Sequence, residues 1–428
     1  MSQAPASSPS SKKAQPLQRP KGTQDVLPGE MGKWHHIEAT ARRLFGQYGY
    51  SEIRTPVFEY TSLYERGVGE ETDIVNKEMY TFEKGERLLT LRPEGTAGVV
   101  RGFVENGMSR MPKPVKLYYM GPMFRYERPQ AGRQRQFHQI GVEIFGIEGP
   151  MADVETILTA MRFFEALGVP NLALEINNIG DPSCRERFRE GFRKLMKPHL
   201  DSLCENCRRR YDTNPMRMLD CKVPTDKALY QQPEVQQFLA EDFTSDECKA
   251  HFQAVQDALT GLGIPFTRNP NLVRGLDYYN RTVFEITSNH LGAQNAVCGG
   301  GRYDILFEKL GAATMPGIGW ALGVERLVSL IEDQSIQPLD YYIVSDQPAA
   351  AFGLQQELHG KGVSAEVDLT GKGFGKQLAA AGKRQARFAV ILGESEIQEN
   401  QVTVKNLENG EQESHSREVF LAQISGGR

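Results

Sequence analysis

The chain has 428 residues, of which 39% are hydrophobic, so it can bury a large core and should hold two or three domains. Its formal net charge of −4 argues against a protein that coats nucleic acid without specificity. Six cysteines without the spacing of a disulfide scaffold fit a reducing compartment, and neither a signal-peptide core nor an apolar run of transmembrane length is found. These features predict a cytoplasmic protein with no membrane partner.

The first part of the chain predicts a tail, a helix and an interrupted strand. Residues 1–17 are rich in Ser, Ala, Pro and Gln and should form a disordered N-terminal tail. Residues 34–48 place apolar side chains on one stripe, which predicts an amphipathic helix. Residues 50–59 read as a strand that Pro56 interrupts, so this strand should lie at a sheet edge or an interface. The next expected elements are a strand and a helix, at 88–92 and 97–106.

Strands are predicted at 116–120, 123–127 and 136–145, with a loop at 127–135 between the last two. Four arginines fall within eleven positions at the end of the second strand and in this loop, namely Arg125, Arg128, Arg133 and Arg135. Because guanidinium groups bind phosphate oxygens two at a time, the cluster suits a polyphosphate or a nucleic-acid backbone, although a solvated basic loop is the alternative. The strand that follows carries Gln139 and Glu143, which indicates a second, smaller polar ligand.

Residues 181–263 differ from the rest, because Arg/Glu-rich helical patterns replace the strand signals and indicate a helical insertion. Cys204, Cys207 and Cys221 could supply three zinc ligands, but a structural zinc site has four. The fourth would have to come from one of three more distant residues, Cys184, His199 or Cys248. Ordinary thiols are therefore expected, with no bound metal.

Strand patterns return at 282–287 and 296–298, followed by three glycines and a helix from Tyr303. Residues 317–321 form a glycine-rich strand that leads into a helix at 324–331. Because glycines lack a side chain, a glycine-rich strand lets a nucleotide ring approach its backbone. Arg326, on the first turn of the helix that follows, is therefore expected in a nucleotide site.

Short strands alternate with helices from residue 340 onward, which indicates a small α/β domain with a largely parallel sheet after a linker at 334–338. The segment 371–376 is not a phosphate loop, because Gln377 replaces the required Ser or Thr. Residues 372–387 contain five basic side chains and no acidic one. With the basic residues of 101–135, they suit a large polyanion held at two places.

Several segments resemble the histidyl-tRNA synthetases, a family of class II aminoacyl-tRNA synthetases. Thr55-Pro56 resembles motif 1 of the class, the arginine loop from Met123 to Phe137 resembles motif 2, and residues 317–326 resemble motif 3. Residues 274–279 (RGLDYY) and 298–304 (CGGGRYD) resemble the two histidine motifs of the family. Together with 91–96 (LRPEGT), the resemblance extends from about residue 21 to the C-terminus.

The resemblance implies an α+β catalytic domain built on an antiparallel sheet at 18–333, with the helical insertion at about 181–263. It also implies a C-terminal α/β anticodon-binding domain at 339–428. The implied reaction is ATP-dependent ligation of L-histidine to tRNA(His) through a histidyl-adenylate, with release of AMP and pyrophosphate. ATP, Mg²⁺ bound through the ATP phosphates, and a homodimer built through motif 1 are implied as well.

Site residues follow from the same resemblance, residue by residue. Arg274 and Arg125 are the expected catalytic residues, since each can neutralise the reacting phosphate. The expected ATP site consists of Arg125, Glu127, Arg133, Phe137 and Arg326. The expected histidine site consists of Glu94, Thr96, Gln139, Glu143, Arg274, Tyr278 and Tyr279. The expected tRNA contacts are Arg128, Gln130, Lys372, Lys376, Lys383 and Arg384, with a solvated helix face as the alternative for the last four.

A regulatory subunit of ATP phosphoribosyltransferase is the alternative to a synthetase. These non-charging paralogues bind histidine but lack the anticodon domain and have eroded motifs. The presence of residues 340–428 and of the full arginine set disfavours this alternative, although fold alone does not determine function.

Overall fold

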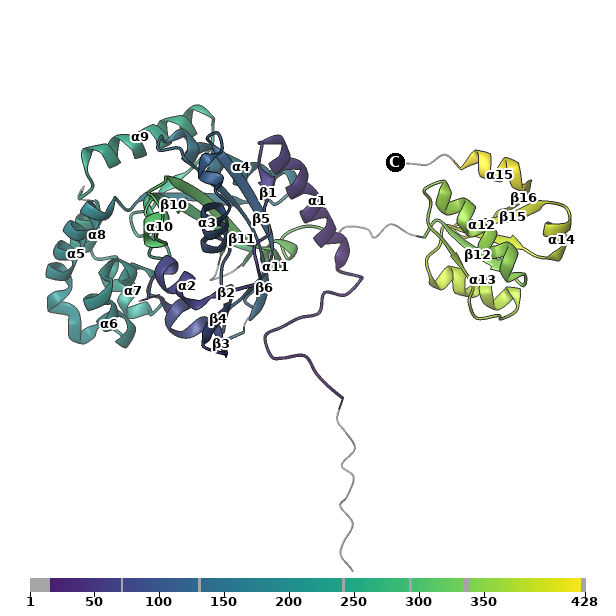
Figure 1. Ribbon diagram of the computed structural model, residues 1–428, viewed down its shortest axis with the longest axis horizontal. Coiled ribbons are helices and arrows are strands. Elements are labelled where there is room, and N and C mark those ends of the chain that lie inside the picture. The colour runs from purple at the N-terminus through teal and green to yellow at the C-terminus, as the bar shows by residue number, and fades with distance from the viewer. Residues whose placement is uncertain are drawn as a thin grey trace, which may run out of the picture. The chain divides into compact units, whose positions relative to one another are not determined.

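The structure is a computed structural model that describes residues 16–70, 72–129, 132–240, 243–291, 295–333 and 339–424. The chain divides into two compact units, Met1–Asp333 and Gln334–Arg428 (Figure 1). The linker expected at 334–338, and all of the expected tail except residues 16 and 17, lie outside the described residues.

An eight-stranded sheet forms the centre of the first unit, with the strand order β1-β5-β6-β11-β10-β9-β7-β8. The six strands in the middle run antiparallel to their neighbours, and only β1 and β8 at the two edges pair in parallel. The antiparallel sheet expected for the catalytic domain is thus confirmed. The strands are β1 Ser51–Glu52, β5 Val115–Phe124, β6 Gln136–Phe145, β7 Leu172–Asn178, β8 Thr267–Arg268, β9 Asn280–Ser288, β10 Ala296–Arg302 and β11 Gly317–Gly323.

Helices cover this sheet through two apolar cores. One core packs α1 (Met31–Gln47), α4 (Met151–Ala166) and α11 (Val324–Val328) against the strands, with Phe45 near Trp320 at a ring distance of 5.8 Å. The other core packs α3 (Thr96–Glu105) and α10 (Leu306–Lys309) against the strand side chains that point away from the first core. Side chains alternate between the faces of a strand, so the two cores occupy opposite faces of the sheet.

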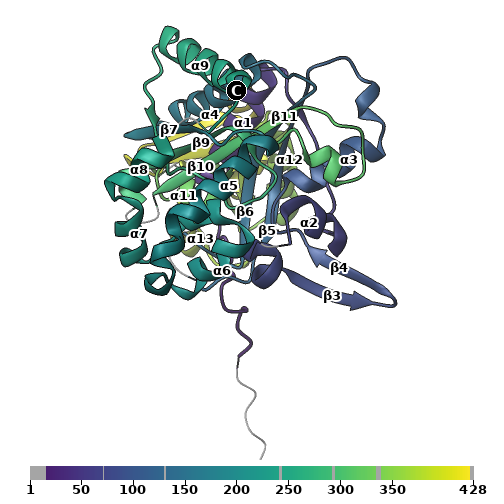
Figure 2. The ribbon, with the colours of Figure 1, turned by 90° about the vertical axis from the view of Figure 1, so that its left-hand side faces the viewer.

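A second, three-stranded sheet lies beside α2 (Thr61–Val68) and has the order β2-β4-β3. Its strands are β2 Phe58–Tyr60, β3 Tyr80–Lys84 and β4 Arg87–Leu91, and the β3–β4 hairpin projects from the body of the unit (Figure 2). The strand expected at 50–59 is in fact two strands, because the chain leaves the large sheet after β1 and enters this small sheet at β2. Pro56 lies in the connection, where no ladder hydrogen bond is needed.

The helical insertion has its own apolar core, built around Phe188, Phe192 and Met218. Its helices are α5 Pro182–Met196, α6 Glu205–Thr213, α7 Pro224–Tyr230, α8 Pro233–Ala240 and α9 Asp246–Gly261. Asp181 caps α5 by accepting from the Cys184 backbone N–H at 2.9 Å, as an N-cap carboxylate does. Helix α9 differs from the others, because its apolar residues belong to the core of the large sheet.

Two local expectations in this unit are wrong. The separate strands expected at 116–120 and 123–127 form one continuous strand, β5. The three glycines expected after the strand at 296–298 lie within β10, and the helix expected from Tyr303 begins at Leu306.

The second unit holds a five-stranded sheet with the order β13-β12-β14-β15-β16. Only β12, β13 and β14 are parallel, so the expectation of a largely parallel sheet holds for three strands and misses the antiparallel hairpin. The strands are β12 Tyr341–Ser345, β13 Ala365–Val367, β14 Phe388–Leu392, β15 Gln401–Asn406 and β16 Gln412–Ser416. The helices are α12 Pro348–Gly360, α13 Phe374–Lys383, α14 Glu394–Gln398 and α15 Arg417–Gln423.

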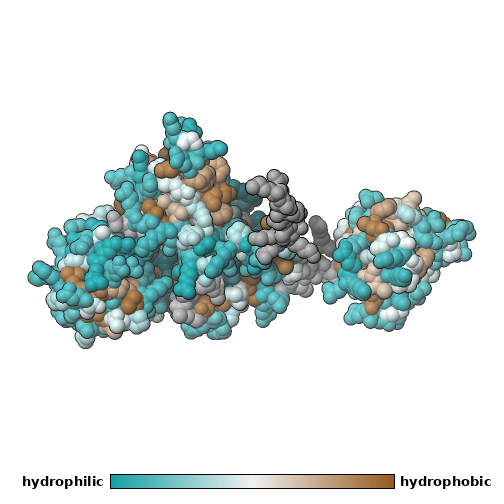
Figure 3. All heavy atoms as spheres, turned by 90° about the horizontal axis from the view of Figure 1, so that it is seen from below, coloured by the Kyte–Doolittle hydropathy of each residue, from teal (hydrophilic) through white to brown (hydrophobic). Residues whose placement is uncertain are grey.

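Hydrophilic side chains dominate the face of each unit seen in Figure 3, with scattered apolar residues between them. Among the described residues, no helix has the length and apolar character needed to cross a membrane.

Candidate active site

The residues expected to bind nucleotide and amino acid meet in one cavity of about 530 Å³ on the large sheet. The lining residues from the expected sets are Glu94, Thr96, Arg125, Glu127, Arg133, Phe137, Gln139, Arg274, Tyr278, Tyr279 and Arg326. Glu143 is fully buried and does not line the cavity, but it accepts a hydrogen bond from Thr96 of the wall. Segments more than 200 positions apart in the sequence therefore form one site.

Arginines gather in one region of the cavity. Arg133 donates from Nη1 to Glu127 Oε2 at 2.8 Å, and Arg125 donates from Nε to the Pro93 carbonyl at 2.8 Å. The Arg125 guanidinium also lies 5.4 Å from the centre of the Phe137 ring. This cluster can bind an anionic ligand of several phosphates next to the half-buried ring of Phe137.

The acidic part of the cavity is built on the start of α3. Glu94 accepts from the backbone N–H groups of Thr96 and Ala97, both at 2.8 Å, and so serves the unpaired donors of the first helical turn. The Thr96 hydroxyl is thereby directed to Glu143 Oε1 at 2.8 Å, while the Tyr303 hydroxyl donates to the other oxygen of Glu143.

Burial changes the acidity of both carboxyl groups. Desolvation raises the pKa of Glu94 against the lowering effect of its backbone N–H donors. Desolvation raises the pKa of Glu143 to about 8, although hydrogen bonds from Tyr303 and Thr96 favour its charged form. The two buried carboxyl groups, of Glu94 and Glu143, together favour a ligand that carries positive charge.

Other polar atoms nearby have no partner. Among the described residues, Gln139 Oε1 and the Tyr119 hydroxyl are buried without a hydrogen bond. The rings of Tyr278 and Tyr279 lie beside them, 4.6 Å apart between centres. A buried acceptor without a donor costs free energy, so this part of the cavity suits a ligand rich in N–H groups.

Arg274 is held at the side of the cavity by a carboxylate and an aromatic ring. Its Nη1 donates to Glu285 Oε2 at 2.7 Å, and its guanidinium carbon lies 6.0 Å from the centre of the Tyr279 ring. A side chain at Gly299 would overlap this guanidinium, which explains why β10 has a glycine there. Arg274 Nε is buried without a partner in the described part of the chain and remains free to donate.

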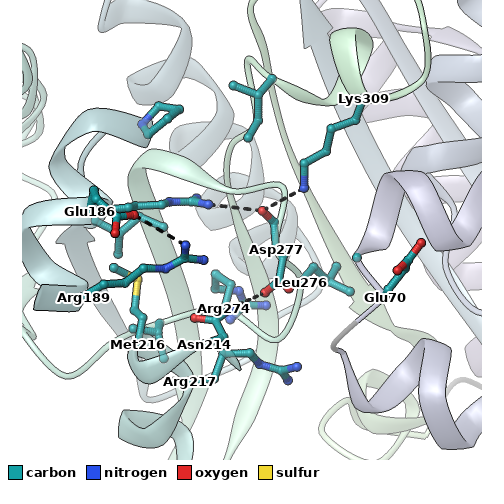
Figure 4. Close-up of a pocket in the computed structure, with 16 residues that line it drawn as sticks. Glu70, Glu186, Arg189, Asn214, Met216, Arg217, Arg274, Leu276, Asp277 and Lys309 are labelled. Atoms are coloured by element: carbon teal, nitrogen blue, oxygen red, sulfur yellow. Dashed lines mark hydrogen bonds and ion pairs between the residues drawn. The ribbon is translucent and has the colours of Figure 1, made fainter. Parts of the chain in front are cut away.

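A second cavity, of about 350 Å³, lies behind the segment that carries Arg274 (Figure 4). Asp277 is at its centre and accepts from Asn214 Nδ2 at 2.9 Å through its carboxylate. Its backbone carbonyl accepts from Arg185 at 3.2 Å and from Lys309 at 3.3 Å. The helical insertion and α10 thus hold the segment of Arg274 from two sides.

Three polar residues of the site were not expected. Glu285 pairs with Arg274, Tyr303 donates to Glu143, and Glu325 accepts from the His138 backbone N–H at 2.9 Å. A signal existed for Glu285, since it is the one acidic residue of β9 and is flanked by Phe284 and Ile286. Tyr303 lies within the second histidine motif, but sequence alone does not reveal what it contacts.

The expected tRNA contacts are distributed over both units. Arg128 is exposed and does not line the cavity, and Gln130 lies outside the described residues. In the second unit the side chains of the expected basic set are exposed, namely Lys372, Lys376, Lys383 and Arg384. Arg384 forms two hydrogen bonds to Glu366, at 2.9 and 3.0 Å, so its guanidinium is already engaged.

Fold and site together define a class II aminoacyl-tRNA synthetase, with an arginine cluster and a buried polar recess on an antiparallel sheet. Residues 22–327 match the family described as histidyl-tRNA synthetase, and residues 340–426 match the anticodon binding domain. The chain belongs to the histidyl-tRNA synthetase family.

Individual relatives agree with this placement. The protein of Desulforamulus reducens named Histidine--tRNA ligase is 48% identical over 413 residues, which cover 94% of this chain and 98% of that protein. The Listeria innocua protein of the same name is 46% identical over 422 residues, 96% of this chain and 98% of its own. The apo histidyl-tRNA synthetase of S. aureus superposes with a TM-score of 0.79 at 37% identity, over 95% of this chain and 99% of that chain.

Proposed function

We propose that the chain is a histidine–tRNA ligase that joins L-histidine to tRNA(His) at the expense of ATP, through a histidyl-adenylate. The observation that carries the proposal is the single cavity in which an arginine cluster faces a buried recess of two carboxyl groups and unpaired acceptors. The first part matches a triphosphate, and the second matches an amino acid with an ammonium group and a ring N–H.

Adenylate formation needs charge stabilisation more than proton transfer. The carboxylate of histidine, ionised at neutral pH, attacks the α-phosphorus of ATP, and the bond to pyrophosphate breaks. Arg125 and Arg274 would neutralise the negative charge that spreads over the α-phosphate oxygens. Arg133 and Arg326 would hold the β- and γ-phosphates, and Mg²⁺ bound through these phosphates would supply further positive charge. Phe137 would stack on adenine, and Glu127 would accept from its amino group.

Histidine recognition would use the buried recess. Glu94, Thr96 and Gln139 would bind the amino and carboxylate groups, and the unpaired oxygen of Gln139 suits an ammonium donor. Tyr279, with Tyr278 beside it, would bind the imidazole, and Glu143, which does not line the cavity, would contribute through its hydrogen bond from Thr96. An apolar amino acid would leave these polar groups buried and unpaired, which can discriminate by roughly 10⁴-fold or more, so no editing site is needed.

Transfer to tRNA would follow in the same cavity. The terminal ribose hydroxyl attacks the adenylate carbonyl and AMP leaves, with an adenylate phosphate oxygen as the proposed proton acceptor. Arg128 and Gln130 would approach the acceptor end. In the second unit, Lys372, Lys376, Lys383 and Arg384 would bind the anticodon arm, where the three lysines, unlike Arg384, have no carboxylate partner among the described residues.

A homodimer is proposed through the small sheet. Phe58, Tyr60 and Phe82 lie on the same face of this sheet, opposite Leu89 or Leu91 in register, and are 53%, 52% and 43% exposed. An exposed aromatic face next to motif 1 supports an interface between two copies of the chain. Light scattering of the purified protein should give twice the chain mass, and Phe58→Asp should shift it towards the monomer.

The assay that tests the function is exchange of labelled pyrophosphate into ATP, run with each amino acid and with or without a tRNA(His) transcript. Exchange should depend on histidine alone, and the transcript should then become charged. The regulatory alternative predicts histidine binding without exchange. A protein from Bacillus halodurans, described as ATP phosphoribosyltransferase regulatory subunit/histidyl-tRNA synthetase, shares the fold at a TM-score of 0.64 but is only 22% identical. The anticodon binding domain at 340–426 and the relatives of up to 48% identity named Histidine--tRNA ligase favour the ligase, and the assay tests it directly.

A further inference from the structure

Three cysteines and one aspartate converge in the helical insertion, away from the groups used in the reaction. Cys204 precedes α6, Cys207 lies in its first turn, Cys221 follows the turn at Pro215–Asp220, and Asp226 lies in the first turn of α7. One sulfur from each cysteine and one carboxylate oxygen all lie within 4.8 Å of one another.

The spacing of these atoms matches a tetrahedral zinc site. Zinc–sulfur bonds of about 2.3 Å and zinc–oxygen bonds of about 2.0 Å place neighbouring sulfurs about 3.8 Å apart and a sulfur about 3.5 Å from an oxygen. The Sγ atoms of Cys204 and Cys221 are 3.8 Å apart, and Cys221 Sγ is 3.5 Å from Asp226 Oδ2.

Backbone N–H groups donate to two of the sulfurs and to the carboxylate of the cluster. The N–H of Cys207 donates to Cys204 Sγ at 3.4 Å, and the N–H of Val223 donates to Cys221 Sγ at 3.4 Å. The Cys204 N–H donates to the carboxylate of Asp226 at 3.2 Å. Donors of this kind orient metal ligands and stabilise their charged form.

Asp226 supplies an independent reason for a bound cation. It is 1% exposed, and its carboxylate forms no ion pair with a lysine or arginine in the described part of the chain. A buried carboxylate needs a compensating charge, and here three sulfurs, not ammonium or guanidinium groups, surround it.

We infer that Cys204, Cys207, Cys221 and Asp226 form a structural Zn²⁺ site. Binding of the ion displaces the three thiol protons, and its two positive charges offset the three thiolates and the carboxylate in part. The soft sulfur ligands and tetrahedral spacing select zinc over magnesium or calcium.

This inference revises the expectation of no metal. None of the three residues considered as a fourth ligand joins the cluster. Cys184 and Cys248 lie instead with Asp181 in a separate group of three, which is one ligand short of a structural site. The fourth ligand is Asp226, which follows Cys221 by five positions. The fold of the chain into α7 brings its carboxylate to the three cysteines.

The site would connect the insertion to the active site. Asp220 and Lys222 flank Cys221, Lys227 follows Asp226, and all three line the catalytic cavity. A metal bound by Cys221 and Asp226 would fix residues 220–227 in place as a wall of the cavity. The proposal does not depend on the ligase reaction, because metal content is measured without it.

Elemental analysis of the full-length protein, purified without chelators, tests the proposal. We expect close to one zinc per chain in the wild type and less than a tenth of that in Cys221→Ser. Cys184→Ser is the matched control, since it removes a buried thiol from α5 of the same insertion, and it should keep its zinc.

Cobalt substitution keeps the test independent of how the variants fold. Wild-type protein stripped of metal and reloaded with Co²⁺ should show a thiolate-to-cobalt charge-transfer band and the intense ligand-field bands of tetrahedral cobalt. Wild-type protein without zinc and without these bands would overturn the proposal. So would iron in place of zinc, or zinc retained in Cys221→Ser.

Discussion

Replacement of Glu143 by glutamine should change how the stability of the catalytic unit depends on pH. The Glu143 carboxyl group is fully buried, and burial raises its pKa from 4.5 to about 8. The folded state therefore keeps this proton through neutral pH, while the unfolded chain releases it. The stabilisation from the protonated group is complete below about pH 4.5 and is lost as the pH rises towards 8.

The size of the effect follows from proton linkage. Between pH 5 and pH 7 the unfolded chain is mostly ionised at this position and the folded chain mostly protonated, so each pH unit costs close to 1.4 kcal/mol. Over this interval the loss is roughly 2–3 kcal/mol. Glutamine has the shape of the protonated side chain but cannot ionise, so Glu143→Gln should gain roughly 2–3 kcal/mol relative to the wild type as the pH rises from 5 to 7.

Tryptophan fluorescence during denaturant unfolding measures this difference. The only two tryptophans, Trp34 and Trp320, are both buried in the first unit, so the signal reports the unit that contains Glu143. A constant offset from altered hydrogen bonds to Thr96 and Tyr303 cancels when the two pH values are compared. A wild-type-to-variant difference that stays constant from pH 5 to pH 7 would refute the protonated state of Glu143.

Three further changes test other parts of the site. Arg274→Ala should lower the rate of pyrophosphate exchange by about 10² or more while histidine affinity, measured by calorimetry, changes less than about tenfold; a normal exchange rate would remove its catalytic role. Gly319→Ala places a Cβ against the Glu143 carboxylate, so it should raise the KM for histidine and destabilise the unit by about 1–3 kcal/mol, whereas Gly46→Ala, which meets open space on α1 of the same unit, should do neither. Asp153→Asn removes one of the two carboxylate partners of the fully buried Arg302, the other being Asp304, and should cost about 3–5 kcal/mol in denaturant unfolding. A loss below about 1 kcal/mol would contradict the need for that pair.

Periodicity located the strands whose side chains alternate. The strand predicted at 136–145 has the bounds of β6, because its apolar residues mark the buried positions. The hairpin of β15 and β16 was missed. Most side chains of β16 are exposed, so nothing in its composition distinguishes it from a polar loop.

The residue types in the sequence indicated which residues line the cavity, but they did not indicate which residues contact one another there. The arginine loop and the polar residues of β6 indicated two ligands, and these residues do meet in one cavity. Their partners could not be foreseen. Tyr303 reaches Glu143 across 160 positions of sequence, and such a pair is created only when β6, β10 and β11 are assembled.

The glycine-rich strand was predicted, but the sequence did not reveal all the reasons for its glycines. The glycine-rich strand at 317–321 was expected to admit a nucleotide ring. In the structure a side chain at Gly319 would overlap the Glu143 carboxylate, and one at Gly317 would overlap the Tyr303 ring. These two glycines make room for protein side chains that form the recess, and the identity of a neighbour on another strand is not contained in local sequence.

The helical insertion forms part of the active site, because some of its residues line the cavity. Its own apolar core would allow it to be a separate module, yet polar contacts join it to the catalytic sheet at several points. Arg210 pairs with Asp73 at 2.8 Å beside the cavity, and Asn214 bonds to Asp277 in the segment that carries Arg274. Between these contacts and the zinc ligands lie residues that line the cavity itself. The position of Arg274 therefore depends on the insertion, and the proposed metal, which fixes the fold of the insertion, acts on the same wall of the site.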